Sequence, residues 1–550
     1  MSNLFRKKNV ERALADVQGL EEHNLGGGMK RSLGLIDLTA FGIAAVVGAG
    51  IFSTIGKASF EAGPGIILLF IFVAIACGFS ALCYAEFASL VPASGSAYTY
   101  SYVAFGEIIA WIIGWDLIME YAIGNIVVAI SWSGYFTGLC KGVGLEIPPY
   151  LATDFWAARD GLNETSKAAW ASAPELFGLK LICNIPAFMI VVIISFITYI
   201  GIKESKKSAN AMVLLKIGVV LLVIFAGAFY VQPANWIPFL PNGFSGVLGG
   251  ITSVFFAYIG FDAISTTAEE CENPQRDLPR SMILSLVICT VLYIAIALVL
   301  TGMVNYKDLN VSEPLSFVFE KIGWHWMAGI IAVSAVVATA SVLLVFQIGQ
   351  PRIWMSMSRD GLLPKKFATI HPKFGTPSYA TVLAGIIVAV PALFANMDLM
   401  VDLTSIGTLF AFALVAAGVM VMHAEGKYSP SFKVTFINAK WIYTPLFVLS
   451  ILSICLFDMS VMLEYLGLQN GFELQNMRMV LPHYIFLVMC VYLIYYSFTR
   501  NTSLIPLLAL LSCGYLLSES GARNWERFIL WLLLGIIIYF GYGQKKSKLA

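Results

Sequence analysis

Long apolar runs, separated by short polar connections, repeat along almost the whole chain. Because about 20 apolar residues are needed to cross the hydrocarbon core of a bilayer as a helix, each run of roughly that length predicts one membrane span. Fourteen such runs occur, at residues 35–57, 65–91, 102–139, 181–201, 209–231, 244–268, 282–304, 326–350, 378–396, 402–423, 441–463, 480–498, 503–518 and 525–543. The pattern therefore predicts an all-α integral membrane protein.

Two of these runs are interrupted by glycine. The first is broken at Gly48 and Gly50, and the second at Gly260. In hydrocarbon an unpaired backbone N–H or C=O costs several kcal/mol, so a helix is broken only where the freed groups line a cavity or meet a ligand. Glycine also permits close helix packing, so one broken run alone leaves packing and a binding site as equal alternatives. Two broken runs at corresponding places indicate the substrate site of a secondary transporter.

The first break predicts the chemistry of the ligand. A half-helix that restarts after the break directs free N–H groups and the positive end of its dipole at the gap, which suits a carboxylate. The groups expected to be free are the N–H groups of Gly48, Ala49, Gly50 and Ile51 and, for an ammonium, the carbonyls of Val46 and Val47. Together these groups would hold both ends of a zwitterion.

The breaks fall in spans one and six, five spans apart. An odd offset inverts the second group of five helices relative to the first, which is the inverted repeat of many transporters. The expected organisation is an N-terminal arm, a first repeat, a second repeat, accessory helices and a tail, at residues 1–32, 33–232, 243–423, 441–543 and 544–550. The longest polar stretch, residues 141–180, is expected to be an external loop that is partly helical.

Composition and charge narrow the class of protein further. Hydrophobic residues make up 59% of the chain and charged residues 12%, which is outside the range of soluble domains. A net charge of +1 gives no reason to expect a nucleic acid partner. The nine cysteines form no CxxC pair and the five histidines are scattered, so we expect no disulfide framework, metal site or cofactor. Lys and Arg gather at both ends and in even-numbered connections, which predicts cytoplasmic termini in a plasma membrane protein.

Ionisable side chains inside a span cost about 3 kcal/mol and are candidates for function. Lys216 lies well inside span five, where both snorkelling to the interface and a role as proton carrier fit its position. Asp116 and Glu120 share one face of span three. Asp116 is expected to be structural, whereas for Glu120 a structural role and a role in the pocket or in coupling both stay open. Asp262 is expected to cap freed N–H groups, and Glu86, near the inner end of span two, is expected to form an interfacial pair or a gate.

Several short motifs occur in order along the chain. They are Leu33–Leu38 with Gly48–Phe52, Tyr84–Ala88 with Pro92–Tyr100, Gly114–Tyr121, Phe255–Ala263 with Ala268–Pro274, and Gly349–Arg352 with Met357–Pro364. Together they resemble the amino acid–polyamine–organocation (APC) superfamily and, within it, the cationic amino acid transporter family. The resemblance implies a LeuT-like fold: ten core helices in two inverted five-helix repeats, with helices 1 and 6 broken, and four further helices.

The resemblance also implies roles for particular residues. It assigns the substrate carboxylate and part of the amino group to the backbone of Val47, Gly48, Ala49, Gly50 and Ile51, and the rest of the amino-group site and the side-chain flank to Phe256, Ala257 and Ile259. Lys216 matches the lysine that takes the place of a sodium ion in proton-coupled members. Leu343 would shorten a pocket for arginine, whereas Glu120 is placed to form an ion pair with a cationic side chain. The sequence therefore leaves open whether the substrate is neutral or cationic.

The expected function is therefore secondary active transport of an L-amino acid, by proton symport and alternating access. A sodium-independent exchanger is the nearest alternative, and a membrane amino acid sensor is a more distant one. The sequence shows no pairing of nucleophile and base, no metal cluster and no phosphate loop, so we do not expect an enzyme. The expected partners are an amino acid, a proton and the lipid bilayer.

Overall fold

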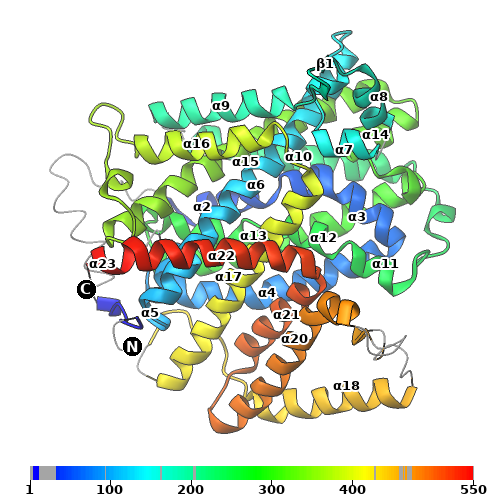
Figure 1. The fold of residues 1–550 in the computed structure, drawn as a ribbon. Coiled ribbons are helices and arrows are strands. Elements are labelled where there is room, and N and C mark those ends of the chain that lie inside the picture. The colour runs from blue at the N-terminus through cyan, green and yellow to red at the C-terminus, as the bar shows by residue number, and fades with distance from the viewer. Residues whose placement is uncertain are drawn as a thin grey trace.

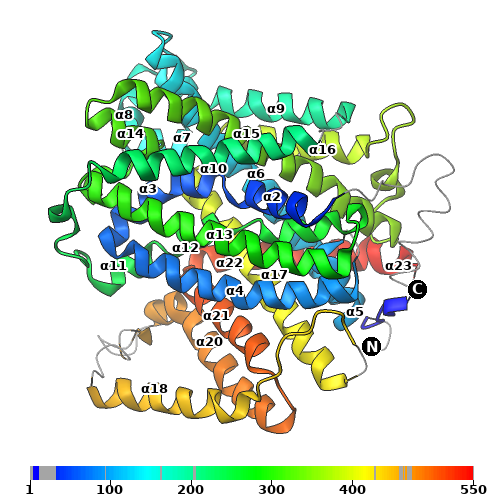
Figure 2. The same ribbon diagram turned by 180° about the vertical axis from the view of Figure 1, so that it is seen from behind.

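The computed structural model describes residues 4–11, 33–92, 95–161, 164–201, 206–426, 429–457, 463, 465–467 and 474–548, and consists almost entirely of helices. Most of the long helices run nearly parallel to one another, horizontally in Figure 1 and Figure 2. Eight helices in the described part of the chain are long and apolar enough to cross a membrane, and six shorter apolar helices accompany them. The predicted all-α membrane architecture is confirmed, and within the described residues every predicted apolar run coincides with helix. Residues 458–462, at the end of the predicted run 441–463, lie outside the described residues.

The first half of the chain contains the first broken span and a small domain outside the long helices. Its elements are α2 (Leu35–Val46), η1 (Gly50–Thr54), α3 (Ile55–Ala62), η2 (Gly63–Gly65), α4 (Ile66–Leu90), α5 (Ser96–Ala104), α6 (Glu107–Gly142), η3 (Pro149–Leu151), α7 (Phe155–Asp160), α8 (Glu164–Ser172), β1 (Glu175–Leu176), β2 (Leu179–Lys180), α9 (Ile185–Ile200), α10 (Lys206–Ala228) and η4 (Pro233–Trp236). The strands β1 and β2 pair antiparallel. The predicted polar loop is thus partly helical, as expected, and also carries a hairpin.

The second half begins with the second broken span. Its elements are α11 (Gly243–Gly249), α12 (Ile251–Tyr258), η5 (Phe261–Glu270), α13 (Pro274–Met303), η6 (Tyr306–Asp308), α14 (Pro314–Lys321), α15 (His325–Arg359), η7 (Lys365–Ala368), α16 (Ser378–Ala392), α17 (Met397–Glu425), η8 (Ala439–Trp441), α18 (Tyr443–Phe457), α20 (Leu474–Thr499), α21 (Leu504–Glu519), α22 (Ala522–Ile538), η9 (Tyr539–Gly543) and α23 (Gln544–Lys546).

Several helix boundaries differ from those predicted by hydropathy, and two of the differences have a clear physical reason. The third span begins at Glu107 instead of residue 102, because Gly106 adopts a φ of +103° and separates α6 from α5. A Cβ at Gly106 would lie 2.6 Å from the backbone carbonyl carbon of Phe5, so glycine also permits the close approach of the N-terminal segment. The α15 helix continues to Arg359, beyond the predicted end at residue 350, because its last turns are buried within the protein.

The two broken spans pack against each other in the middle of the molecule, with the first part of each span against the second part of the other. The helix α2 packs against η5, whereas η1 and α3 pack against α12. The helices α4 and α13 pack against each other and α13 also packs against α2, while α6 packs against α15 and α17. The interrupted segments are therefore enclosed by long helices on several sides.

The last helices attach to this core through aromatic and polar contacts. The indole ring of Trp531 on α22 stacks on Trp115 of α6 with ring centroids 4.6 Å apart, whereas α18 lies along the bottom edge in both views (Figures 1 and 2).

The loop before α18 is held by Glu86 of α4, which lies 2.6 Å from His423 Nε2 and accepts a hydrogen bond of 2.9 Å from the Val434 N–H. Glu86 thus forms the pair expected from the sequence.

Candidate functional site

The first break lies where the sequence predicted it. The helix α2 ends at Val46, and Val47 leaves helical geometry with φ −76° and ψ 89°. The N–H groups of Ile51 and Phe52 both donate to the carbonyl of Gly48 at 3.1 Å, because the chain re-enters helix through the π-helical turn η1. Ile51 therefore does not offer a free N–H group, contrary to the prediction. For the N–H groups of Gly48, Ala49 and Gly50, no backbone hydrogen bond to a described residue outside their own helix is found, and their availability to a ligand stays a prediction.

The second break is built differently. The helix α12 ends at Tyr258, Ile259 is extended with φ −62° and ψ 138°, and Gly260 has a φ of +119°. A Cβ at Gly260 would lie 2.9 Å from the carbonyl carbon of Ala45, so both the backbone conformation and the approach to α2 require glycine. The chain then continues as η5, a 3₁₀-helix of ten residues, which is unusually long for this helix type.

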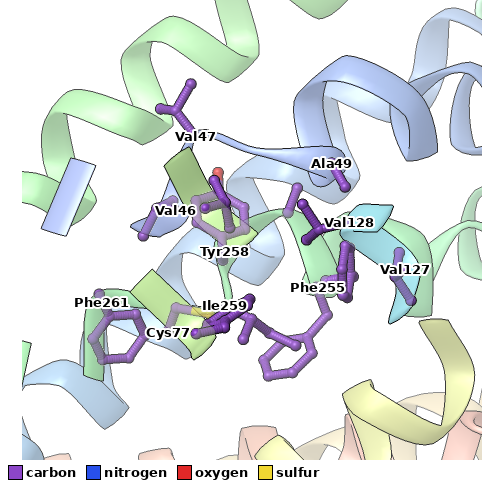
Figure 3. Packing of buried hydrophobic residues seen from close by; sticks show 14 of the residues in the cluster. Val46, Val47, Ala49, Cys77, Val127, Val128, Phe255, Tyr258, Ile259 and Phe261 are labelled. Carbon is purple, nitrogen blue, oxygen red and sulfur yellow. The ribbon is translucent and has the colours of Figure 1, made fainter. Parts of the chain in front are cut away.

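The two breaks lie against each other. A Cβ at Gly50 would lie 2.3 Å from Ala257 Cα, and a Cβ at Gly48 would lie 2.8 Å from Val342 Cγ2 on α15. Figure 3 shows Ala49 from the first break on the same side of the view as Phe255 from the second, with Val127 and Val128 of α6 alongside, whereas the side chain of Val47 points away from them. The two breaks are thus in contact through Gly50 and Ala257, and the first break also contacts α15 through Gly48.

The side chains around the breaks are apolar and buried. Solvent exposure is 0% for Val47 and Ile51, 6% for Phe256, 5% for Ile259 and 1% for Leu343 on α15. Ala49 and Ala257 are buried as well. The polar groups available at this site are therefore backbone N–H and C=O groups together with a few buried ionisable side chains.

Two side chains hold carbonyls of α2 next to the first break. Lys216 on α10 is fully buried and its Nζ donates a hydrogen bond of 2.8 Å to the carbonyl of Ala44. The buried hydroxyl of Tyr293 on α13 donates a hydrogen bond of 2.9 Å to the carbonyl of Val46. Since Lys216 points into the protein, snorkelling to the membrane surface does not describe it.

Tyr293 was not among the residues predicted from the sequence to take part in the site. Its ring packs with Tyr258 and Phe70, at centroid distances of 5.5 Å and 5.8 Å. A tyrosine within an apolar span needs a partner for its hydroxyl, and that signal was present in the sequence. The carbonyl of Val46, predicted to face an ammonium, thus already accepts one hydrogen bond and keeps one lone pair.

Three carboxyl groups on α6 and η5 are buried in the helical core, and Asp262 directly follows the second break. Asp116 is fully buried and Glu120 is 4% exposed; within the described residues both oxygens of Asp116 and Oε2 of Glu120 have no hydrogen-bond partner. Asp262 lies within reach of the backbone N–H groups of Gly260 and Ala263, which is the capping role expected for it. In the described ranges no group of three or more His, Cys, Asp and Glu side chains is arranged to hold a metal ion.

Comparison with known families decides the class of this protein. A family model described as "Amino acid permease" matches residues 33–540, which is most of the chain. The chain belongs to the amino acid permease family. This membership confirms the resemblance to the APC superfamily, and it establishes an integral, multi-pass membrane protein of a family of permeases.

Individual relatives cover nearly the whole permease. The chain is 38% identical over 548 residues to the branched-chain amino acid permease BcaP of Bacillus subtilis (strain 168), covering 100% of this chain and 99% of that protein. It is 43% identical over 441 residues to the methylthioribose transporter of the same organism, covering 80% and 89%. It is 31% identical over 624 residues to the vacuolar cationic amino acid transporter 2 of Arabidopsis thaliana, covering 100% and 93%. Two of these relatives are named for amino acids and one for methylthioribose; with the family model, the first two support amino acid transport and the predicted link to cationic amino acid transporters.

Proposed function

We propose that this permease is a proton-coupled symporter of an L-amino acid with a LeuT-like arrangement of two inverted five-helix repeats. The observation that carries the proposal is the buried ammonium of Lys216, 2.8 Å from the carbonyl of Ala44 beside the first break. An ammonium buried in this place holds α10 and α2 together through its hydrogen bond to the carbonyl of Ala44, as a metal cation bound there would. Loss of the proton removes the charge of Lys216 and weakens this interaction, so the protonation of Lys216 is coupled to the position of α2.

The substrate zwitterion binds at the two breaks. The N–H groups of Gly48, Ala49 and Gly50 receive its carboxylate, since no backbone hydrogen bond from them to a described residue outside their own helix is found and they stand at the start of a helix. Its ammonium meets carbonyl groups at the ends of α2 and α12. Alternating access then follows from movement of the half-helices relative to α6 and α15.

The lining of the site favours a neutral aliphatic side chain. Phe256, Ile259 and Leu343 are apolar and almost completely buried, and a charged side chain would have to give up its hydration next to them. Glu120 is the carboxyl group that would form an ion pair with the side chain of a cationic substrate. The relatives include one named for branched-chain amino acids and one named for cationic amino acids, so a transport panel must contain both classes.

We propose that both ends of the described chain lie on the cytoplasmic side of the membrane, which the contacts between them support. Lys8 forms an ion pair of 3.0 Å with Asp360, and the N–H of Lys548 donates to the carbonyl of the same Asp360. An even number of spans agrees with this arrangement.

The proposal is tested by replacing Lys216 with alanine in the full-length protein in proteoliposomes. We expect Lys216→Ala to abolish accumulation driven by a proton gradient while exchange of internal for external amino acid continues, which also shows that the variant is folded. Lys216→Met, which keeps most of the side-chain volume, is the second variant, and Lys307→Ala, at an exposed lysine of η6, is the control. Undiminished accumulation in both Lys216 variants would contradict proton coupling through this residue.

A further inference from the structure

The hairpin β1–β2 carries an unusual pair of features at its tip. Phe177 is 97% exposed, and its φ of +53° lies in the left-handed region that a bulky residue rarely adopts. Leu179, two residues later, is 72% exposed. The exposed aromatic ring is unfavourable in water, and nothing within the described residues covers it. The backbone at Phe177 directs the ring away from the domain at a local conformational cost.

The hairpin is held firmly by the small domain from which it projects. Its base pairs Glu175 with Lys180, and the N–H of Leu181 donates a hydrogen bond of 3.0 Å to the carbonyl of Pro174. Lys180 also lies over the ring of Trp170 on α8, 4.9 Å from its centroid. This domain has its own apolar core, formed by Tyr150, Phe155, Ala158, Ala169, Trp170, Ala173 and Ile182. The tip is therefore presented in a fixed position and is not a loosely tethered loop.

The domain is fixed in turn to the membrane helices. Asn184, directly before α9, accepts hydrogen bonds from Ser133 of α6 and from the N–H of Ala187, and its own N–H donates to the carbonyl of Leu393. The hairpin thus keeps a constant place relative to the beginning of α9.

The apolar tip continues the lipid-facing surface of α9. This short apolar helix exposes a row of large apolar side chains along its length, namely Ile185, Met189, Val192, Ile193 and Phe196. Leu181, between the hairpin and α9, is 49% exposed and extends the row toward the tip. Figure 1 shows the hairpin at the end of α9 where that helix begins, and both views show it standing out beyond α9 (Figures 1 and 2).

We propose that the hairpin tip is a membrane-interface anchor that inserts Phe177 and Leu179 among the lipids of the leaflet at the beginning of α9. Its apolar tip enters the boundary between headgroups and acyl chains, while the charged Glu175–Lys180 base remains at the level of the headgroups. Aromatic side chains are enriched at this depth in membrane proteins because the interface accommodates a ring better than water does. The recognised partner is the phospholipid bilayer itself, with no requirement for one headgroup.

The anchor is tested by placing an environment-sensitive fluorophore at the tip of the full-length protein in nanodiscs. A cysteine introduced as Phe177→Cys is labelled with NBD, and labelling of the unaltered protein is measured as background. Nanodiscs are then made with phospholipid that carries a nitroxide on the upper acyl chain. We expect the nitroxide lipid to reduce NBD emission about twofold at position 177, since a label at interface depth lies within contact range of the upper acyl chain.

A matched control comes from the same domain. Glu164 on α8 has a highly exposed side chain, at 91%, and is polar, so NBD at Glu164→Cys is expected to be quenched by aqueous iodide and not by nitroxide lipid. Quenching by iodide alone at position 177, with nitroxide lipid without effect, would overturn the proposal. Protection of position 177 in native membranes but not in nanodiscs would overturn it as well, because the occupant of the tip would then be another protein.

Discussion

At the scale of single residues, the site depends on side chains that hold backbone groups. Lys216 and Tyr293 reach the carbonyls of Ala44 and Val46 from two different helices, α10 and α13. One donor carries a charge and the other is neutral. We infer that the charged donor serves coupling, while the neutral donor keeps the free groups of the break in the geometry that binds the substrate.

This division predicts the effect of removing the Tyr293 hydroxyl. Tyr293→Phe keeps the ring contacts and loses one buried hydrogen bond, so we expect KM for the amino acid to rise about fivefold, equivalent to about 1 kcal/mol, with the proton-driven component retained. Tyr258→Phe is the matched control, because its hydroxyl bonds the carbonyl of Phe70 outside the break in the same aromatic cluster. Equal effects of the two variants on KM would argue against a positioning role for Tyr293.

A second prediction at this scale concerns a carboxyl group outside the membrane helices. Burial, and then the nearby Glu320, raise the pKa of Glu313 to about 7, with Lys141 acting in the opposite direction. A carboxyl group that binds its proton more tightly in the folded chain stabilises the fold at low pH, and this contribution is lost as the pH rises from about 4.5 to about 7. Glu313 directly precedes α14 and lies against Gly134 and Gly138 of α6.

Thermal unfolding of the purified protein between pH 4.5 and 7.5 measures this contribution. We expect the stability of the unaltered protein to fall with rising pH more steeply than that of Glu313→Gln, which has no proton to lose. Glu146→Gln, at an exposed carboxylate in another loop, is the control and should behave like the unaltered protein. Superimposable pH profiles for Glu313→Gln and the unaltered protein would contradict the raised pKa.

At the scale of elements, the broken helices are held together by glycines that permit contact between backbones. A Cβ at Gly50 would lie 2.3 Å from Ala257 Cα and 2.7 Å from its Cβ. Since backbone atoms cannot move aside as a flexible side chain can, the half-helices must separate to admit a methyl group. The close approach of η1 to α12 therefore depends on the absence of a side chain at Gly50.

Gly50→Ala is therefore expected to disrupt transport. We predict loss of stability of about 1–3 kcal/mol from overpacking, together with loss of substrate binding, measured by thermal unfolding and by uptake. Gly78→Ala is the matched control, because Gly78 lies in α4 with nothing within 4 Å of the added Cβ. Unimpaired uptake by Gly50→Ala would show that the two breaks do not need this contact.

The elements also show what the sequence could and could not predict. The positions of both breaks followed from glycine within apolar runs, and the helices followed from hydropathy. The hydrogen bond from Ile51 to Gly48 did not follow, because the π-helical turn η1 has no sequence signature. The hairpin was missed because two-residue strands are too short for alternation to appear. The start of α6 was misplaced because hydropathy does not register the turn at Gly106.

At the scale of the whole molecule, membership of the amino acid permease family agrees with the all-α architecture and with the two breaks that meet at its centre. Distant pairs such as Lys216 with Ala44, and Glu86 with His423, join helices far apart in the chain. Such pairs could not be predicted from one sequence, since spacing alone does not determine which helices become neighbours. The resemblance to a known family suggested the coupling role that we propose for Lys216, and the structure adds the carbonyl of Ala44 to which its ammonium donates.

The most direct test of proton-coupled amino acid transport is uptake of labelled amino acids into proteoliposomes. The panel contains neutral branched, small neutral and cationic amino acids, measured with and without an inward proton gradient and in the absence of sodium. We predict accumulation above the external concentration only with the gradient, strongest for neutral aliphatic substrates. Rapid exchange with internal amino acid, but no accumulation with any substrate, would contradict symport and identify the protein as an exchanger.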